Sequence, residues 1–170
     1  MTNESGRQQK VRTALRGISG VHVTAWKSDG EADWALTGEI VARIAEAGIH
    51  NIVSAGNTGE FYPMTTEEVV RSHAVAAEAA AGKALVTAGI GRSLREAVST
   101  GRLAARAGCD AVMVHHPLDP FAAPQSQADY FLAIAEALEI PLVAYVRSDA
   151  IGVKDLARVA NHPNVAGVKF

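Results

Sequence analysis

Lys169 is the residue in this sequence best suited to covalent chemistry. It follows the apolar run 164–168, Asn-Val-Ala-Gly-Val, which predicts a short buried strand that ends in a single amine. Burial disfavours the ammonium form and lowers the pKa of a lysine, so that the neutral amine can attack a carbonyl carbon and form an imine. The alternative is a lysine at a strand end whose charged head stays in water.

A second candidate element is the segment 54–60, Ser-Ala-Gly-Asn-Thr-Gly-Glu, directly after another predicted strand. Gly56 lets the backbone turn sharply and approach a ligand. Successive N–H groups in such a turn can hold a carboxylate, and Asn57 and Thr58 add side-chain donors. The segment is therefore a candidate carboxylate site. The alternative is an ordinary loop of turn residues with nothing bound.

Tyr145 and Arg147 form the third candidate element. Tyr145 ends the predicted strand 141–145, where its phenol can relay protons or hydrogen-bond a bound intermediate. Tyrosine is also common in strands, so plain packing is the alternative. Arg147 follows on the loop, where it can reach a substrate carboxylate or, alternatively, pair with Asp149 at the surface.

The elements that must position these residues repeat one unit: a short apolar strand, a loop and an amphipathic helix. The sequence predicts strands over residues 18–23, 51–54, 85–88, 111–114, 141–145 and 165–169, and helices over about 33–47, 65–81, 94–107, 127–138 and 154–160. The strands are apolar on both faces, which is typical of a parallel sheet covered by helices. Gly48, Gly82 and Gly108 lie where helices are expected to end.

This alternation fits either an open doubly wound sheet or a (β/α)₈ barrel. No Gly-x-Gly-x-x-Gly motif follows the first strand, which weakens the dinucleotide-binding form of the open sheet. A barrel needs eight strands and about 250 residues, so this chain would cover about the first six strands. We therefore expect an α/β fold with a TIM-barrel domain over residues 15–170, incomplete at its C-terminus, after a polar segment over residues 1–14.

In a barrel, Asn57, Thr58, Tyr145 and Lys169 would all lie at the C-terminal ends of strands. That rim is where barrel enzymes build their active sites. The three candidate elements therefore predict one site rather than three unrelated features.

The composition limits the possible partners. The chain has 170 residues, of which 48% are hydrophobic and 20% charged, and its formal net charge is −2. One domain without a basic run gives no reason to expect nucleic acid. No apolar run is long enough to span a bilayer, and the first ten residues lack the apolar core of a secretory signal. The single Cys109 excludes an internal disulfide and suits a reducing compartment, so we expect a cytoplasmic protein without a membrane partner.

Two adjacent histidines, His115 and His116, follow the predicted strand 111–114, and His22 lies in the first strand. Neighbouring residues of a strand point to opposite faces, so only one of the pair can face a barrel interior. No carboxylate lies at a supporting ligand spacing, and we expect no metal site. Binding of substrate hydroxyls by His115 or His116 is the alternative role.

Together, these motifs resemble the dihydrodipicolinate synthase/N-acetylneuraminate lyase family of Schiff-base aldolases. Residues 56–60 (Gly-Asn-Thr-Gly-Glu) match the family pattern Gly-x-Thr-Gly-Glu, and residues 167–169 (Gly-Val-Lys) match its Gly-x-Lys on strand six. Tyr145 matches the family's strand-five tyrosine, and residues 23–25 (Val-Thr-Ala) are similar to its Val-Thr-Pro. The resemblance extends from about Leu15 over nearly the whole chain.

The resemblance implies a (β/α)₈ barrel that assembles as a homotetramer or homodimer and requires no metal or bound cofactor. It implies that Lys169 forms an imine with pyruvate or another 2-oxo acid, the small-molecule substrate. Asn57 and Thr58 would bind the carboxylate of that acid, and Tyr145 would shuttle protons. The implied function is a lyase or synthase that forms or breaks a C–C bond next to the imine.

Three positions depart from the family pattern. Asn57 replaces one threonine of a common Thr-Thr pair, residues 117–119 (Pro-Leu-Asp) replace Pro-Tyr-Tyr, and Ala150 replaces an arginine of the lysine-biosynthesis enzymes. Residues 59–61 and 145–150 are more similar to the 5-dehydro-4-deoxyglucarate dehydratase branch, from which Val146 departs. In that branch the imine promotes loss of water from a sugar diacid, and Arg147 would bind the second carboxylate. The remaining alternatives are a family member that has lost catalysis and acts as a binding or regulatory protein, and a metal-dependent aldolase.

Overall fold

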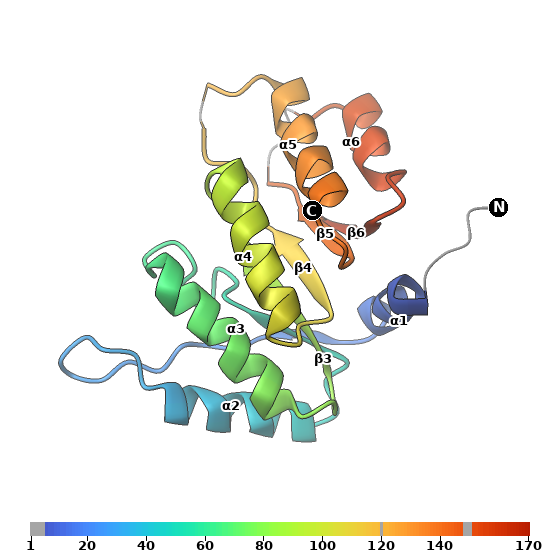
Figure 1. Ribbon diagram of the computed structural model, residues 1–170. Helices are drawn as coiled ribbons and strands as arrows, with labels where there is room; N and C mark the ends of the chain where they lie inside the picture. Colours follow the sequence, from blue (N-terminus) through green and yellow to red (C-terminus); the bar gives the residue numbers. More distant parts are fainter. Residues whose placement is uncertain (1–5, 120, 148–150) are drawn as a thin grey trace.

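Six parallel strands follow one another around a curled sheet in the order in which they occur in the chain (Figure 1). This computed structural model describes residues 6–119, 121–147 and 151–170. The strands are β1 (Ser19–Val21), β2 (Asn51–Ser54), β3 (Leu85–Ile90), β4 (Ala111–Val114), β5 (Leu142–Tyr145) and β6 (Val165–Lys169). An open doubly wound sheet would reverse its strand order at a switch point. The uninterrupted order therefore confirms the predicted barrel architecture, of which this chain forms a half-barrel.

One helix follows each of the first five strands. These are α2 (Trp34–Glu46), α3 (Thr66–Ala80), α4 (Leu94–Arg106), α5 (Pro124–Ala137) and α6 (Val153–Ala160). Local signals start them, since Thr65 and Glu68 form a reciprocal capping box at α3 and the Ser93 hydroxyl accepts a hydrogen bond from the Glu96 N–H at α4. Helix α5 begins three residues before the predicted start, because Pro124 is well suited to a first helical turn.

Two apolar layers hold the half-barrel together. Alternate strand residues such as Ile52, Val112 and Leu142 pack against the helices on the outside of the sheet. The residues between them, Val53, Met113 and Val143 among others, point to the concave inner face. Strand residues alternate between faces, so each buried strand contributes to both layers and reads as continuously apolar in the sequence.

Helix α1 (Gly6–Leu15) is an element that the polar composition of the first 14 residues does not predict. It packs against β6 near the N-terminal ends of the strands (Figure 1). Val11 is 1% exposed there, and Ala14 and Leu15 join the same cluster. Three apolar residues at helical spacing are too few for a clear periodic signal, so tertiary packing decides this helix. A domain boundary at residue 15 stays a prediction.

No helix in the described part of the chain is both long and apolar enough to cross a membrane.

Candidate active site

Tyr145 and Lys169 are brought together by the pairing of β5 with β6. The two residues are register partners at the C-terminal ends of these parallel strands, and the Val146 N–H donates to the Lys169 carbonyl at 2.8 Å. The Lys169 Nζ lies 4.1 Å from the centroid of the Tyr145 ring. This geometry allows a cation–π contact when the amine is charged. A phenol and an amine are therefore neighbours at the rim.

Strand β6 is buried at its start and exposed at its end, where Lys169 lies, so among the described residues Lys169 corresponds to the alternative of a strand-end lysine with its head in water. Val165 at the start of β6 is 2% exposed, but Val168 is 36% exposed and Lys169 is exposed as well. The reason is the position of β6, which pairs only with β5 among the described strands and is an edge of the sheet. Apolar composition indicates a strand that can be buried, whereas its neighbours decide whether it is.

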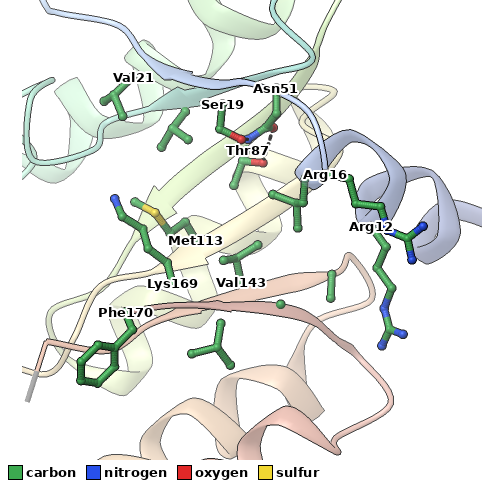
Figure 2. A pocket seen from close by; sticks show the side chains of 15 residues that line it. Arg12, Arg16, Ser19, Val21, Asn51, Thr87, Met113, Val143, Lys169 and Phe170 are labelled. Atoms are coloured by element: carbon green, nitrogen blue, oxygen red, sulfur yellow. Dashed lines mark hydrogen bonds between the residues drawn. The ribbon is translucent and has the colours of Figure 1, made fainter. Parts of the chain in front are cut away.

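The concave face of the sheet forms a cavity of about 640 Å³ with Lys169 on its wall. Figure 2 shows Lys169 and Phe170 toward one side of this cavity, and Arg12 and Arg16 of the α1 segment toward the other. Between them, the Asn51 amide donates to the Ser19 hydroxyl at 3.2 Å and accepts from the Thr87 hydroxyl at 2.7 Å. The cavity therefore extends from the rim toward α1. Within the described residues, no cluster of three or more histidine, cysteine or acidic side chains forms a metal site.

Arg147 follows β5 and is exposed. Its guanidinium carbon is 5.8 Å from the centroid of the Tyr145 ring, and its backbone N–H approaches the His116 Nδ1 at 3.4 Å. The predicted alternative, a pair with Asp149, falls outside the described residues, as does the departure at Ala150. Arg147 and Lys169 thus place two cationic side chains around one phenol.

The segment 54–60 forms a tight turn after β2 in which Gly56 is buried and Asn57 and Thr58 are exposed. A Cβ at Gly56 would lie 2.7 Å from the Val21 Cγ1, so a larger residue does not fit. The Glu60 N–H donates back to the Asn57 carbonyl at 3.0 Å. The N–H groups of residues 56, 57 and 58 have no acceptor among the described residues. The carboxylate site at this turn stays a prediction.

The turn is linked to Tyr145 through His115, whose place in the site the sequence did not reveal. The His115 Nε2 is 3.1 Å from the Ala55 carbonyl oxygen, and its ring stacks on Phe61 with centroids 4.2 Å apart. The ring centroid of Tyr145 lies 6.0 Å away. His115 is only 1% exposed, whereas His116 is half-buried, and the binding of substrate hydroxyls by either histidine stays a prediction.

His116 points the other way, toward α5, with its ring 6.2 Å from that of Phe131. The prediction that only one of the two adjacent histidines faces the barrel interior is therefore confirmed. The alternation of side chains along a strand predicts that the two histidines point in opposite directions. Nothing in the neighbouring sequence predicts that His115 contacts the Ala55 carbonyl.

Arg92 binds the backbone that follows this turn, at Phe61 and Met64. Its guanidinium donates to the Phe61 carbonyl at 3.1 Å and to the Met64 carbonyl, and it pairs with Glu96 at 2.8 Å. It also lies 5.1 Å from the centroid of the Phe61 ring. Phe61 is thus packed between a guanidinium and the His115 imidazole, which keeps the loop close to the rim.

Three buried histidines surround the end of β2. Burial lowers the pKa of His73 to about 3, with nearby His22 acting in the same direction. Burial also lowers the pKa of His115 to about 4, and the cations Lys169 and Arg147 add to the effect. Burial lowers the pKa of His22 as well. These imidazoles are therefore neutral at neutral pH, and their desolvation opposes protonation.

We expect the free energy of unfolding to fall as the pH is lowered from 7 to 4.5. Unfolded histidines bind protons below about pH 6.5, whereas folded His73 and His115 do so only near pH 3 and 4. The stability that comes from keeping these two histidines neutral is complete above pH 6.5 and is lost as the pH falls toward the folded pKa values. At pH 5 each of them lowers the free energy of unfolding by about 2 kcal/mol. Urea unfolding at several pH values measures this slope, and a His73→Gln variant with an unchanged slope would contradict the assignment.

Comparison with known proteins assigns this chain to one family. Residues 14–170 match the model of the dihydrodipicolinate synthetase family. The 4-hydroxy-tetrahydrodipicolinate synthase of Gluconobacter oxydans (strain 621H) is 35% identical over 152 residues, which are 86% of this chain and 51% of that protein. The probable 5-dehydro-4-deoxyglucarate dehydratase 1 of Streptomyces coelicolor is 31% identical over 148 residues, 86% of this chain and 47% of that protein.

Solved structures agree with these relatives. Dihydrodipicolinate synthase from Bacillus clausii matches with a TM-score of 0.91 at 40% identity, over 94% of this chain and 54% of that one. The chloride-inhibited dihydrodipicolinate synthase from Acinetobacter baumannii, in complex with pyruvate, matches with a TM-score of 0.84 at 29% identity, over 90% of this chain and 54% of that one. The chain thus spans about half the length of the curated relatives and solved structures that it matches.

Proposed function

The chain belongs to the dihydrodipicolinate synthetase family, and from this premise we propose that it is a Schiff-base lyase or synthase acting on pyruvate or a related 2-oxo acid. The observation that carries the proposal is the 4.1 Å approach of the Lys169 Nζ to the Tyr145 ring at the wall of the cavity. An amine next to a phenol provides both a nucleophile and a proton donor.

In the proposed reaction, neutral Lys169 attacks the ketone carbon of the 2-oxo acid. The carbinolamine that forms loses its oxygen as water, with Tyr145 donating a proton to the leaving hydroxyl, and an imine results. The protonated imine withdraws electrons from the neighbouring carbon, which gives a proton to the Tyr145 phenolate and leaves an enamine. The enamine bonds to an acceptor carbonyl carbon, whose oxygen takes that proton from Tyr145 as the protonated imine forms again, and the phenolate recovers its proton when the imine is hydrolysed. Hydrolysis of the imine returns the Lys169 amine. Both side chains recover their starting states, so the cycle balances without a redox partner.

The carboxylate of the same substrate is proposed to bind at the turn formed by Gly56, Asn57 and Thr58. Support comes from three consecutive N–H groups that have no acceptor in the described part of the chain, together with the exposed side chains of Asn57 and Thr58. Such a run of donors suits an anion. The homotetramer or homodimer that the resemblance implies stays a prediction.

A dehydratase that acts on a sugar diacid is the second candidate function. Two observations favour it: the similarity to the Streptomyces coelicolor dehydratase, and Arg147 at 5.8 Å from the Tyr145 ring. The guanidinium suits a second carboxylate, which pyruvate lacks. The imine chemistry at Lys169 is shared between the two candidates, so they differ in substrate and not in nucleophile.

Trapping of the imine tests the proposal. The purified protein is incubated with borohydride and either pyruvate or a 5-dehydro-4-deoxy sugar diacid, and the adduct is located by intact mass and peptide mapping. We expect a reduced adduct on Lys169, with pyruvate for the first candidate function. Turnover with loss of water from the diacid would favour the dehydratase. An unmodified Lys169 with both compounds would contradict the imine and favour a binding or regulatory protein.

A further inference from the structure

The Ala55 carbonyl is closely surrounded at the start of the turn. The His115 Nε2 lies 3.1 Å from the oxygen. Strand β3 passes so close that a Cβ at Gly89 would lie 2.1 Å from the same oxygen and 3.0 Å from the His115 Nε2. A carbonyl oxygen only accepts hydrogen bonds, so Nε2 must carry the hydrogen and donate it. The His115 side chain therefore donates a hydrogen bond to one backbone oxygen.

The direction of this carbonyl decides where the turn presents its donors. In a trans peptide the C=O and the following N–H point in opposite directions, so the Ala55 oxygen fixes the Gly56 N–H. Ala55 has φ +50°, in the left-handed region that is unfavourable for a residue with a Cβ. Something must therefore stabilise this orientation, and the hydrogen bond from His115 does so.

The same imidazole also fixes the far end of the turn. Phe61 stacks on it with an interplanar angle of 16°, and the Tyr145 ring lies tilted to it with the two centroids 6.0 Å apart. One side chain thus connects Ala55, Phe61 and the phenol of the rim. A shift of His115 would move the carboxylate turn relative to Tyr145 and Lys169.

We propose that His115 is a positioning residue that holds the turn at Gly56, Asn57 and Thr58 in the orientation that accepts the substrate carboxylate. This inference rests on the proposed function for the identity of the ligand. His115 itself is buried and does not touch the substrate. It acts through the Ala55 carbonyl, so its loss should weaken binding of the 2-oxo acid rather than the chemical step.

Two substitutions separate the hydrogen bond from the packing. His115→Phe keeps a flat ring against Phe61 but cannot donate to Ala55, whereas His115→Gln restores an N–H donor. The pyruvate concentration that gives half-maximal borohydride trapping should rise about tenfold in His115→Phe, as expected for one lost buried hydrogen bond. It should stay within about threefold of wild type in His115→Gln. The adduct yield at saturating pyruvate should match wild type in both.

Val112→Ala serves as the matched control, because it removes buried apolar contacts from the outer layer without touching the turn. It should lower the melting temperature and leave the half-saturating pyruvate concentration unchanged. An unchanged half-saturating concentration in His115→Phe, or an equal rise in Val112→Ala, would overturn the proposal. If His115→Phe does not fold, His115→Met removes the donor with an apolar side chain of similar length and carries the same expectation.

A second measurement tests the positioning role of His115 independently of imine trapping. Ligand-observed NMR measures equilibrium binding of pyruvate, non-covalent and imine-bound together, without the reduction step, so binding is detected whether or not an imine is trapped. Wild-type binding without trapping would contradict the imine mechanism, while weaker binding by His115→Phe would still support the positioning role. Equal binding by wild type and His115→Phe would reject that role, whatever the trapping shows.

Discussion

Replacing Lys169 with arginine is expected to abolish both turnover and the borohydride adduct. Arginine keeps a cation that can lie over the Tyr145 ring, where the Lys169 Nζ now lies 4.1 Å from the centroid. The guanidinium is always protonated in proteins and cannot act as the amine nucleophile. Steady-state assays should show a fall in kcat of more than about 10³-fold, the order seen when a covalent nucleophile is removed.

Two comparisons make this result specific. Circular dichroism and melting temperature should be unchanged, since Lys169 is exposed and its replacement leaves no cavity. Lys154→Arg, at an exposed lysine in the first turn of α6, should retain full activity and adduct formation. A Lys169→Arg variant with more than a tenth of wild-type activity would refute the covalent mechanism.

Replacing Gly89 with alanine is expected to have the largest effect on stability. The added Cβ would lie 2.1 Å from the Ala55 oxygen and 2.8 Å from the Ala55 carbonyl carbon, and both are backbone atoms that cannot rotate away. The sheet or the turn must move, at a cost of about 3 kcal/mol. Movement of the turn would also break the hydrogen bond to His115. Urea unfolding should therefore show a lower midpoint, and half-maximal trapping should require more pyruvate.

Gly38→Ala is the matched control because it makes the same chemical change with the opposite expected sign. Gly38 lies within α2, and a Cβ there would meet the Val75 Cγ1 at an ordinary contact distance of 3.5 Å. Alanine in a helix is more favourable than glycine, so this variant should gain about 0.5–1 kcal/mol. If Gly89→Ala were as stable as wild type, the close approach at Ala55 would be wrong.

The differences between sequence and structure occur at contacts between distant segments. The sequence does not predict the α1 helix, because Val11, Ala14 and Leu15 are too few for a periodic pattern and they pack only against distant residues such as Leu85 and Ala111. The sequence leaves open whether Lys169 is buried or exposed, because this depends on β6 pairing only with β5 among the described strands. Neither fact is present in the neighbouring residues of the sequence.

The sequence by itself determined the order of strands and helices, the barrel architecture, and the location of Tyr145 and Lys169 at strand ends. Each of these follows from periodicity, capping residues and glycine positions within a few residues of each other. Only the tertiary structure decided that these two side chains meet, and that His115 joins the Ala55 carbonyl to the rim. The physical reason is that β-strand register and close backbone approach connect residues 24 to 60 positions apart. Such contacts depend on packing of the whole sheet and not on local preference.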